Sequence, residues 1–389
     1  MNEGRKPLRR EENGMRTDRT LSFVAGAILL LLSAGCGSRQ STLPSGLIGT
    51  GSAAITPGND AKAMLRGTGA SLLVEAEDSG SGGYLDIATL PSGPNYSLAA
   101  ADFAPVGVAI ARSGKTAYAW YGQYYGPSKA RFVWIDIATG KISHKLATTG
   151  CGGNIALTPD ETAVVAADPC DTAMLVFSLK SRRIAAKVAL TGLTNPSGIA
   201  LDSTGKTAYV VGKSGMAIVD VPHARQIAAI SLPGGTCWQD TIIGVALGNA
   251  GRNAYAATCD GSSKVPVIAV VDTRTRKLVQ TIEVGPGAEW LADVIASPRH
   301  PYVYASVENS DGVDGEIVAI NTHSNTVTKT ESVHWSPEAL AMSPNGNAVF
   351  ATTWEGAVWY DVGPHGLKGQ EHGPICCSTA EAGFGAFVH

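Results

Sequence analysis

The stretch that decides the fold is Pro196–Val211, PSGIALDSTGKTAYVV, followed by the apolar run Ile218–Asp220. An apolar segment centred on Ala200 and a second one centred on Tyr209 flank Asp-Ser-Thr-Gly, a turn sequence in which the glycine accepts a positive φ. The stretch therefore predicts two short antiparallel strands and a third strand that ends in Asp220.

The same three elements recur along the chain. Runs like the first occur at Val108–Ile110, Ile155–Leu157, Val245–Leu247, Val294–Ala296 and Leu340–Met342. The second strands are centred on Tyr118, Val164, Tyr209, Tyr255, Tyr304 and Val349, with separations of 46, 45, 46, 49 and 45 residues. The third strands end at Asp136, Ser178, Asp220, Asp272, Asn321 and Asp361. Repeats of about this length that hold four short strands are typical of propeller blades.

The two ends of the array complete each other. Stepping back 46 residues from Tyr118 reaches Leu72, and Asp86 then ends a further third strand. Stepping forward 45 residues from Ala341 reaches Ala386, so the first strand missing from the N-terminal repeat lies at the C-terminus. We therefore expect an all-β, seven-bladed β-propeller over residues 61–389, with the ring closed by the C-terminal strand pairing into the first blade. A solenoid is the alternative, but it has no need of the offset strand.

Composition agrees with a folded, β-rich chain. Of 389 residues, 44% are hydrophobic and 16% are charged, which excludes intrinsic disorder. The formal net charge is −3 and no basic stripe stands out, so we expect no nucleic-acid partner.

The unit Pro196–Val211 with Ile218–Asp220 resembles the YVTN-type β-propeller repeat, and the resemblance spans about residues 63–389. It implies the propeller fold but not the activity, because relatives include surface proteins, lactonase-like enzymes and dehydrogenase subunits. The third repeat departs most, with Glu161 at the turn glycine and Ser178 at the Asp, so a local distortion is expected there.

The N-terminus reads as an export signal. Residues 20–35 form an uncharged apolar run after Arg16 and Arg19, too short to span a bilayer comfortably. Translation from Met15 is an alternative that gives a more compact signal peptide. Arg9-Arg10 is not followed by a twin-arginine pattern, so we expect export of the unfolded chain by the general route. We therefore assign residues 1–35 to a signal peptide.

Leu32–Cys36, LSAGC, resembles the bacterial lipobox, with Ser33 where Leu is more usual. The resemblance implies a lipoprotein in which Cys36 is acylated and becomes the first mature residue, facing the periplasm or the cell exterior. Gly37 in place of Asp implies the outer membrane in a two-membrane cell. An ordinary cleaved signal peptide is the alternative. Residues 36–60 then form the lipidated Cys and a Gly/Ser/Thr/Pro-rich tether that spans about 25–30 Å.

Six further cysteines suit an oxidising compartment. Cys151 precedes the first strand of its hairpin and Cys170 follows the second, so both lie at the open end and predict a disulfide. Cys237 and Cys259 occupy the matching places two repeats later. The adjacent pair Cys376-Cys377 predicts a strained vicinal clamp, with a redox switch as the alternative.

Signatures of known chemistry are missing. The chain has no C-x-x-C-H, H-E-x-x-H, G-x-S-x-G or P-loop motif, so we expect no cofactor, metal site or assigned catalytic residue.

Aromatic and acidic residues gather where a propeller would bring its long loops together. Loops between second and third strands, and loops between blades, emerge on one rim. The candidate residues there are Trp120, Tyr124, Trp238, Asp240, Trp290, Asp293, His334, Trp335, Glu338 and Trp354. Rings and carboxylates suit a sugar, a cation or a partner's loop. The alternative is that each Trp fills the gap between blades while its acid binds a backbone N–H.

Two classes of function follow. The first is a lipid-anchored envelope protein that binds a protein or carbohydrate, or acts as a scaffold, through this rim with a monomeric body. The second is an enzyme resembling propeller lactonases or lyases, with carboxylates or His334 near the channel. Because no repeated set of catalytic residue types is present, the sequence favours the binding protein.

Overall fold

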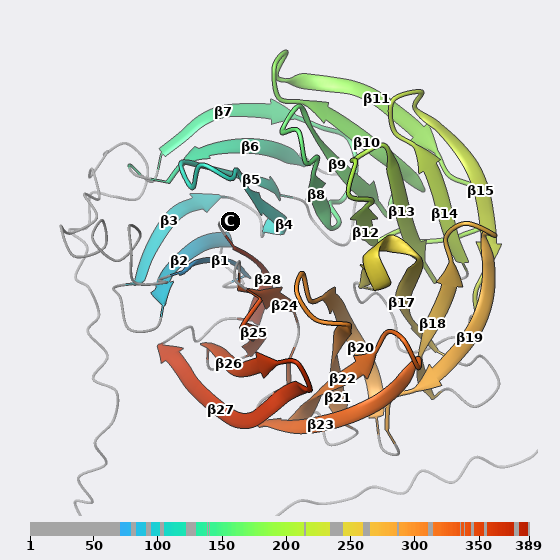
Figure 1. Ribbon diagram of the computed structural model, residues 1–389. Helices are drawn as coiled ribbons and strands as arrows, with labels where there is room; N and C mark the ends of the chain where they lie inside the picture. Colours follow the sequence, from blue (N-terminus) through green and yellow to red (C-terminus); the bar gives the residue numbers. More distant parts are fainter. Residues whose placement is uncertain are drawn as a thin grey trace, which may run out of the picture. The chain divides into compact units, whose positions relative to one another are not determined.

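Short antiparallel strands make up most of the chain that the computed structural model describes, which is residues 71–387 with gaps (Figure 1). The gaps are residues 79–82, 91–94, 102–104, 122–129, 138, 140, 214, 234–243, 260–264, 286–287, 310–313, 335, 338, 344–345, 354–355 and 377–380. Only the backbone is described for residues 71–106, 249, 259, 288–290, 356–357, 370–376 and 381–387. All these residues belong to one of the chain's two units, Leu43–His389.

The described strands form seven four-stranded sheets, and each is antiparallel throughout. The first sheet contains β28 (Glu381–Phe387), β1 (Ser71–Asp78), β2 (Gly83–Leu90) and β3 (Asn95–Ala101), in that order. The second contains β4 (Pro105–Ile110), β5 (Thr116–Tyr121), β6 (Arg131–Asp136) and β7 (Lys141–Ala147). The third contains β8 (Ile155–Leu157), β9 (Ala163–Asp168), β10 (Ala173–Ser178) and β11 (Arg183–Ala189).

The remaining sheets repeat this order. The fourth contains β12 (Gly198–Leu201), β13 (Thr207–Gly212), β14 (Gly215–Asp220) and β15 (Arg225–Ser231). The fifth contains β16 (Val245–Gly248), the 3-10 turn η1 (Asn249–Gly251), β17 (Asn253–Cys259), β18 (Pro266–Asp272) and β19 (Lys277–Glu283). The sixth contains β20 (Ala288–Ala296), β21 (Tyr302–Asn309), β22 (Asp314–Asn321) and β23 (Thr326–His334). The seventh contains β24 (Leu340–Met342), β25 (Ala348–Thr353), β26 (Gly356–Gly363) and β27 (Gly366–Cys376).

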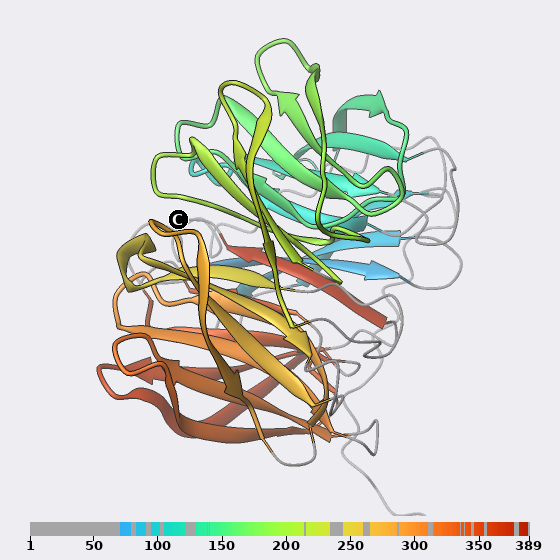
Figure 2. The same ribbon diagram turned by 90° about the vertical axis from the view of Figure 1, so that its right-hand side faces the viewer.

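The innermost strands contact one another in a cycle. β4 contacts β8, and the contacts continue through β12, β16, β20 and β24 to β28, which contacts β4 again (Figure 1). The C-terminal strand β28 pairs with β1, with Val74 opposite Ala386, as the repeat spacing predicts. The fold is therefore all-β and propeller-like, and Figure 2 shows the same strands from the side.

The polar residue that ends a third strand, most often an aspartate, has a structural role. Asp136 Oδ1 accepts the N–H of Thr139 (2.9 Å), and Asp272 Oδ1 accepts that of Thr275 (2.6 Å). These contacts close the turn into the fourth strand, as side-chain oxygens of Asp do in tight turns. The residue four positions after the end of the third strand has a positive φ in four of these turns. These residues are Arg182, Ala224, Arg276 and Asn325.

The third repeat keeps its turns, so the expected distortion is not found in them. Glu161 has a φ of 55°, close to the 65° and 69° of Gly114 and Gly205 at the same turn position. Ser178 replaces the aspartate, and its Oγ accepts the N–H of Ser181 (3.2 Å). The backbone geometry of the repeat therefore survives both departures, although a non-glycine residue in the left-handed region is strained.

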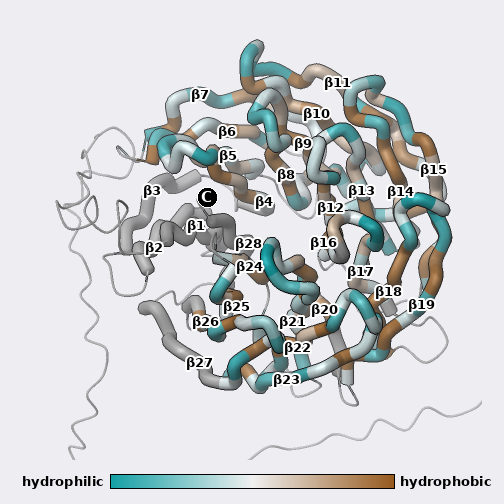
Figure 3. The backbone as a smooth tube through the Cα atoms, viewed as in Figure 1, coloured by the Kyte–Doolittle hydropathy of each residue, from teal (hydrophilic) through white to brown (hydrophobic). Residues whose placement is uncertain are grey.

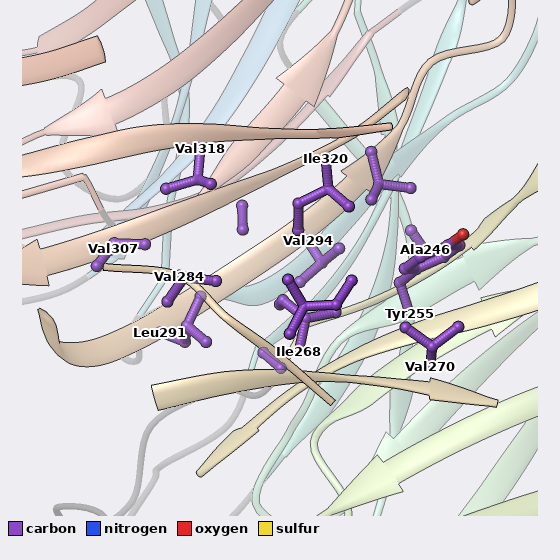
Figure 4. Packing of buried hydrophobic residues seen from close by; sticks show 14 residues of the cluster. Ala246, Tyr255, Ile268, Val270, Val284, Leu291, Val294, Val307, Val318 and Ile320 are labelled. Atoms are coloured by element: carbon purple, nitrogen blue, oxygen red, sulfur yellow. The ribbon is translucent and has the colours of Figure 1, made fainter. Parts of the chain in front are cut away.

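The cores lie between neighbouring sheets. Ile268 and Val270 of β18 pack with Val294 of β20 and Ile320 of β22, all buried (Figure 4). Hydrophobic colour is commonest along the inner and middle strands, whereas the turns and much of the outermost strands β7 and β23 have hydrophilic colour (Figure 3). The sheets are thus fastened to each other by side chains that point across the gap between them.

Candidate functional site

The strands connect on two opposite sides, which differ in construction. We call "loop rim" the side that carries the second-to-third-strand connections and the segments between sheets, such as residues 190–197 between β11 and β12. We call "hairpin rim" the side that carries the first-to-second and third-to-fourth-strand turns, such as residues 179–182 between β10 and β11. The predicted aromatic and acidic site belongs to the loop rim.

A disulfide fastens one inter-sheet segment at the loop rim. Cys151, just before β8, is bonded to Cys170, just after β9, with a Cα–Cα distance of 5.6 Å. The predicted pairing is confirmed. The bond ties the segment that enters the third sheet to the turn between β9 and β10.

Asp168 lies beneath that segment. Its side chain is fully buried, and Oδ1 accepts only long hydrogen bonds from the N–H groups of Cys151 and Asp171 (3.4 Å each). Its Oδ2 has no partner among the described residues. A Cβ on Gly150, whose φ is +115°, would lie 2.3 Å from Oδ2, so the segment approaches the carboxyl as closely as a glycine permits. Burial, with a smaller effect of the Asp171 charge, raises the pKa of Asp168 to about 6.

The end of the second strand meets the incoming segment in other sheets too. Thr258 Oγ1 of β17 donates to the carbonyl of Pro233 (2.5 Å). At Gly212 of β13 a Cβ would lie 2.3 Å from the carbonyl of Thr194. These positions do not stand out in the aromatic and acidic pattern of the sequence, although they share one place in the repeat, directly after the apolar residues of the second strand.

The side chain of Asp293 connects two neighbouring sheets. It is 8% exposed, Oδ1 accepts the N–H of Val294 (2.7 Å), and Oδ2 accepts the N–H of Leu340 at the start of β24 (3.0 Å). A Cβ on Gly244 of the preceding sheet would lie 2.4 Å from Oδ1. Burial raises its pKa to about 6. The acid therefore binds backbone N–H groups, which is the alternative that the sequence left open for the rim acids.

Trp120 corrects the prediction of an exposed aromatic rim at its position. Its side chain is fully buried between the second and third sheets, 5.9 Å from the ring of Phe177, and Nε1 donates to Thr148 Oγ1 (3.1 Å). Because the indole N–H finds a partner inside the core, the residue needs no solvent. Trp120 packs sheets together and is not a contact residue of the rim.

His334 is the second correction. It ends β23, the outermost strand of its sheet, and Nδ1 lies 2.7 Å from Oδ1 of Asp314 on β22. The innermost strand of that sheet is β20, which carries Asp293. The strand order therefore separates His334 from the inner strands where the enzyme hypothesis placed it.

The other candidates lie outside the described residues or side chains. Cys36, Tyr124, Cys237, Trp238, Asp240, Trp335, Glu338, Trp354 and Cys377 are outside the described residues, and Trp290, Cys259 and Cys376 have a described backbone only. Within the described part, no group of three or more His, Cys, Asp and Glu side chains is placed to hold a metal ion. No helix in that part has the length and apolar character needed to cross a membrane.

Comparison with known proteins supports the architecture. No protein-family model matches the chain, and no curated protein matches it. A functionally unknown protein from Desulfotomaculum acetoxidans has a similar structure, with a TM-score of 0.63 and 14% identity over 82% of this chain and 99% of that one. A protein from Bacteroides uniformis provisionally named 6-phosphogluconolactonase gives 0.62 and 17% over 82% and 99%. Hydrazine synthase from Kuenenia stuttgartiensis gives 0.56 and 17% over 66% and 76%. At these identities the likeness shows a propeller-like fold alone.

Proposed function

We propose that this chain is a lipid-anchored protein of the cell envelope that binds a protein or carbohydrate through its loop rim. In this proposal the body is a seven-bladed propeller of YVTN-type repeats, closed by β28, and Cys36 carries the lipid at the outer membrane. The binding residues would be Tyr124, Trp238, Trp335 and Trp354 with the neighbouring acids Asp240 and Glu338.

The observation that supports binding is the frame beneath those loops. The Cys151–Cys170 disulfide, the Thr258–Pro233 hydrogen bond and the Asp293–Leu340 hydrogen bond each hold a segment that enters or leaves a sheet at this rim. A rigid base that carries long loops with aromatic residues is the arrangement in which proteins commonly place binding sites.

An enzyme resembling propeller lactonases is the second candidate, and the similarity to proteins provisionally named 6-phosphogluconolactonase favours it. Two described residues argue against it. Asp293 already accepts two backbone N–H groups, and His334 lies on an outermost strand. A catalytic acid and base would have to come from Asp240 and Glu338.

The decisive test compares full-length wild type with a Trp238→Ala/Trp335→Ala variant on an array of envelope polysaccharide fragments, with 6-phosphogluconolactone hydrolysis measured in parallel. Saturable glycan binding that the variant loses would support the binding function. Lactone turnover abolished by Asp240→Asn or Glu338→Gln would replace it with the enzyme. Metabolic labelling with an alkyne fatty acid tests the anchor, because Cys36→Ala is expected to remove the label.

A further inference from the structure

The hairpin rim carries a basic surface that the linear sequence does not reveal. Between β10 and β11, and at the start of β11, the exposed residues include Lys180, Arg182 and Arg183. The corresponding turn of the next sheet ends in Arg225, which is also exposed.

The third consecutive hairpin, between β18 and β19, adds exposed Arg274, Arg276 and Lys277. Directly after Lys277, Leu278 and Val279 are 37% and 55% exposed, and they are the exposed large hydrophobic residues of the described chain. We call these three hairpins with Leu278 and Val279 the basic patch.

The three hairpins lead into outer strands that are neighbours. The outer strands β11, β15 and β19 contact one another in sequence. Gln226 of β15 accepts the N–H of Thr191 (2.8 Å) from the preceding sheet, and Arg276 Nη1 donates to the carbonyl of Ile227 (3.3 Å). The Arg276–Ile227 bond joins the third hairpin to the first residues of β15, beside the second hairpin, whereas Thr191 lies just after the other end of β11.

The patch has a positive outer face. The carboxylates of Asp220 and Asp272 accept the N–H groups of His223 and Thr275 within their own turns, and they are the two acids of the three hairpins, against the seven Lys and Arg residues named above. Asp220 pairs with Arg225 (3.6 Å) and, when the imidazole is protonated, with His223 (2.9 Å), whereas Lys180, Arg183 and Lys277 form no ion pair among the described residues. Asp160, Glu161 and Asp202 share this rim, but they sit in first-to-second-strand turns nearer the inner strands.

We propose that the basic patch docks on the anionic surface of a lipid bilayer, with Leu278 and Val279 in contact with the headgroup region. Clustered cations beside exposed apolar side chains are the combination that binds anionic lipid. The choice of a bilayer over a soluble polyanion rests on the exposed apolar pair and on the membrane proximity in the proposed function. Docking by this rim turns the loop rim away from the membrane, toward a ligand.

The test measures cosedimentation of the unacylated full chain, carrying Cys36→Ser, with vesicles of phosphatidylcholine alone or mixed with phosphatidylglycerol. The apolar N-terminal segment and the basic residues before it are the same in every sample, so the comparison between variants, and not the dependence on phosphatidylglycerol alone, isolates the patch. We expect binding that rises with phosphatidylglycerol and falls with added salt. Each neutralised cation should weaken it about five-fold, so Arg183→Gln/Lys277→Gln should lose about 25-fold.

The charge-matched control is Lys145→Gln/Lys213→Gln, which removes two cations outside the patch and is expected to retain the wild-type affinity. Equal losses in both variants, or no preference for phosphatidylglycerol, would overturn the proposal. Binding to heparin that depends on the patch, without vesicle binding, would overturn it in favour of a soluble polyanion. Absence of lipid label at Cys36 would refute the anchor and leave the vesicle result standing.

Discussion

Asp168→Asn should make the protein more stable at neutral and alkaline pH. In the folded chain the pKa of the Asp168 carboxyl is raised to about 6 from the ordinary 3.8, because burial disfavours its charge. An acid whose pKa is raised on folding contributes stability that is complete below the unfolded pKa and is lost as the pH rises to the folded pKa. The gap between the two values corresponds to about 3 kcal/mol, which is the cost of holding the charge above pH 6.

Asparagine keeps the shape and an acceptor for the N–H groups of Cys151 and Asp171, but it carries no charge. We therefore expect the variant to exceed wild type by up to about 3 kcal/mol at pH 8 and to match it near pH 4. Urea unfolding at both pH values, without reductant, measures the difference. A stability difference that does not change with pH, or a variant weaker than wild type at pH 8, would refute the reasoning.

Asp293→Asn provides the contrast. This carboxyl also has a pKa of about 6, but its two oxygens accept N–H groups at 2.7 and 3.0 Å. An amide must direct its NH₂ group at one of those donors, so the lost hydrogen bond offsets the removed charge. A gain at Asp293 as large as at Asp168 would show that hydrogen bonding does little for either carboxylate.

Three further outcomes test the packing. Tyr255→Phe should lower the free energy of unfolding by about 1 kcal/mol, because the Tyr255 hydroxyl donates to Asn325 of the next sheet at 2.6 Å. Tyr304→Phe should leave it unchanged, because the Tyr304 hydroxyl is buried without a partner among the described residues. Urea unfolding of both variants measures the two values. Thr172→Gly should stabilise the protein by about 1 kcal/mol, because a β-branched residue there has a φ of 44°, and an unchanged melting temperature would argue against strain. The Cys151→Ala/Cys170→Ala variant should lose about 3 kcal/mol, from the loop that the disulfide closes, and equal denaturation midpoints would contradict this.

The repeat could be predicted because its characteristic residues contact residues that are close to them in the sequence. Asp136 and Asp272 close turns within five residues of themselves, so their role is visible in the linear pattern. Even Glu161, which breaks the pattern, keeps the turn because the neighbouring strands dictate its backbone. The pairing of β28 with β1 followed from spacing alone.

The site was harder to predict because its residues act between sheets. Trp120 lies at the end of a strand, as expected, but Thr148 and Phe177 bury it, and no periodicity encodes those partners. His334 ends the strand β23, in which exposed and partly buried residues alternate, and the position of that strand at the outer edge depends on the order of strands in the sheet. The basic patch arises only when turns separated by whole repeats are brought side by side.

The pairing of β28 with β1 also has a consequence for how the molecule is made. Val74 and Ala386 lie opposite each other in the first sheet. For a flexible chain as long as the segment between them, the entropic free-energy cost of bringing the two ends together is on the order of 5 kcal/mol. The first sheet has only three strands until the ribosome has made the final strand, so β1 keeps an open edge through most of synthesis. Nascent chains therefore carry their aggregation risk at the beginning of the sequence, and a premature stop codon before β28 makes that risk permanent.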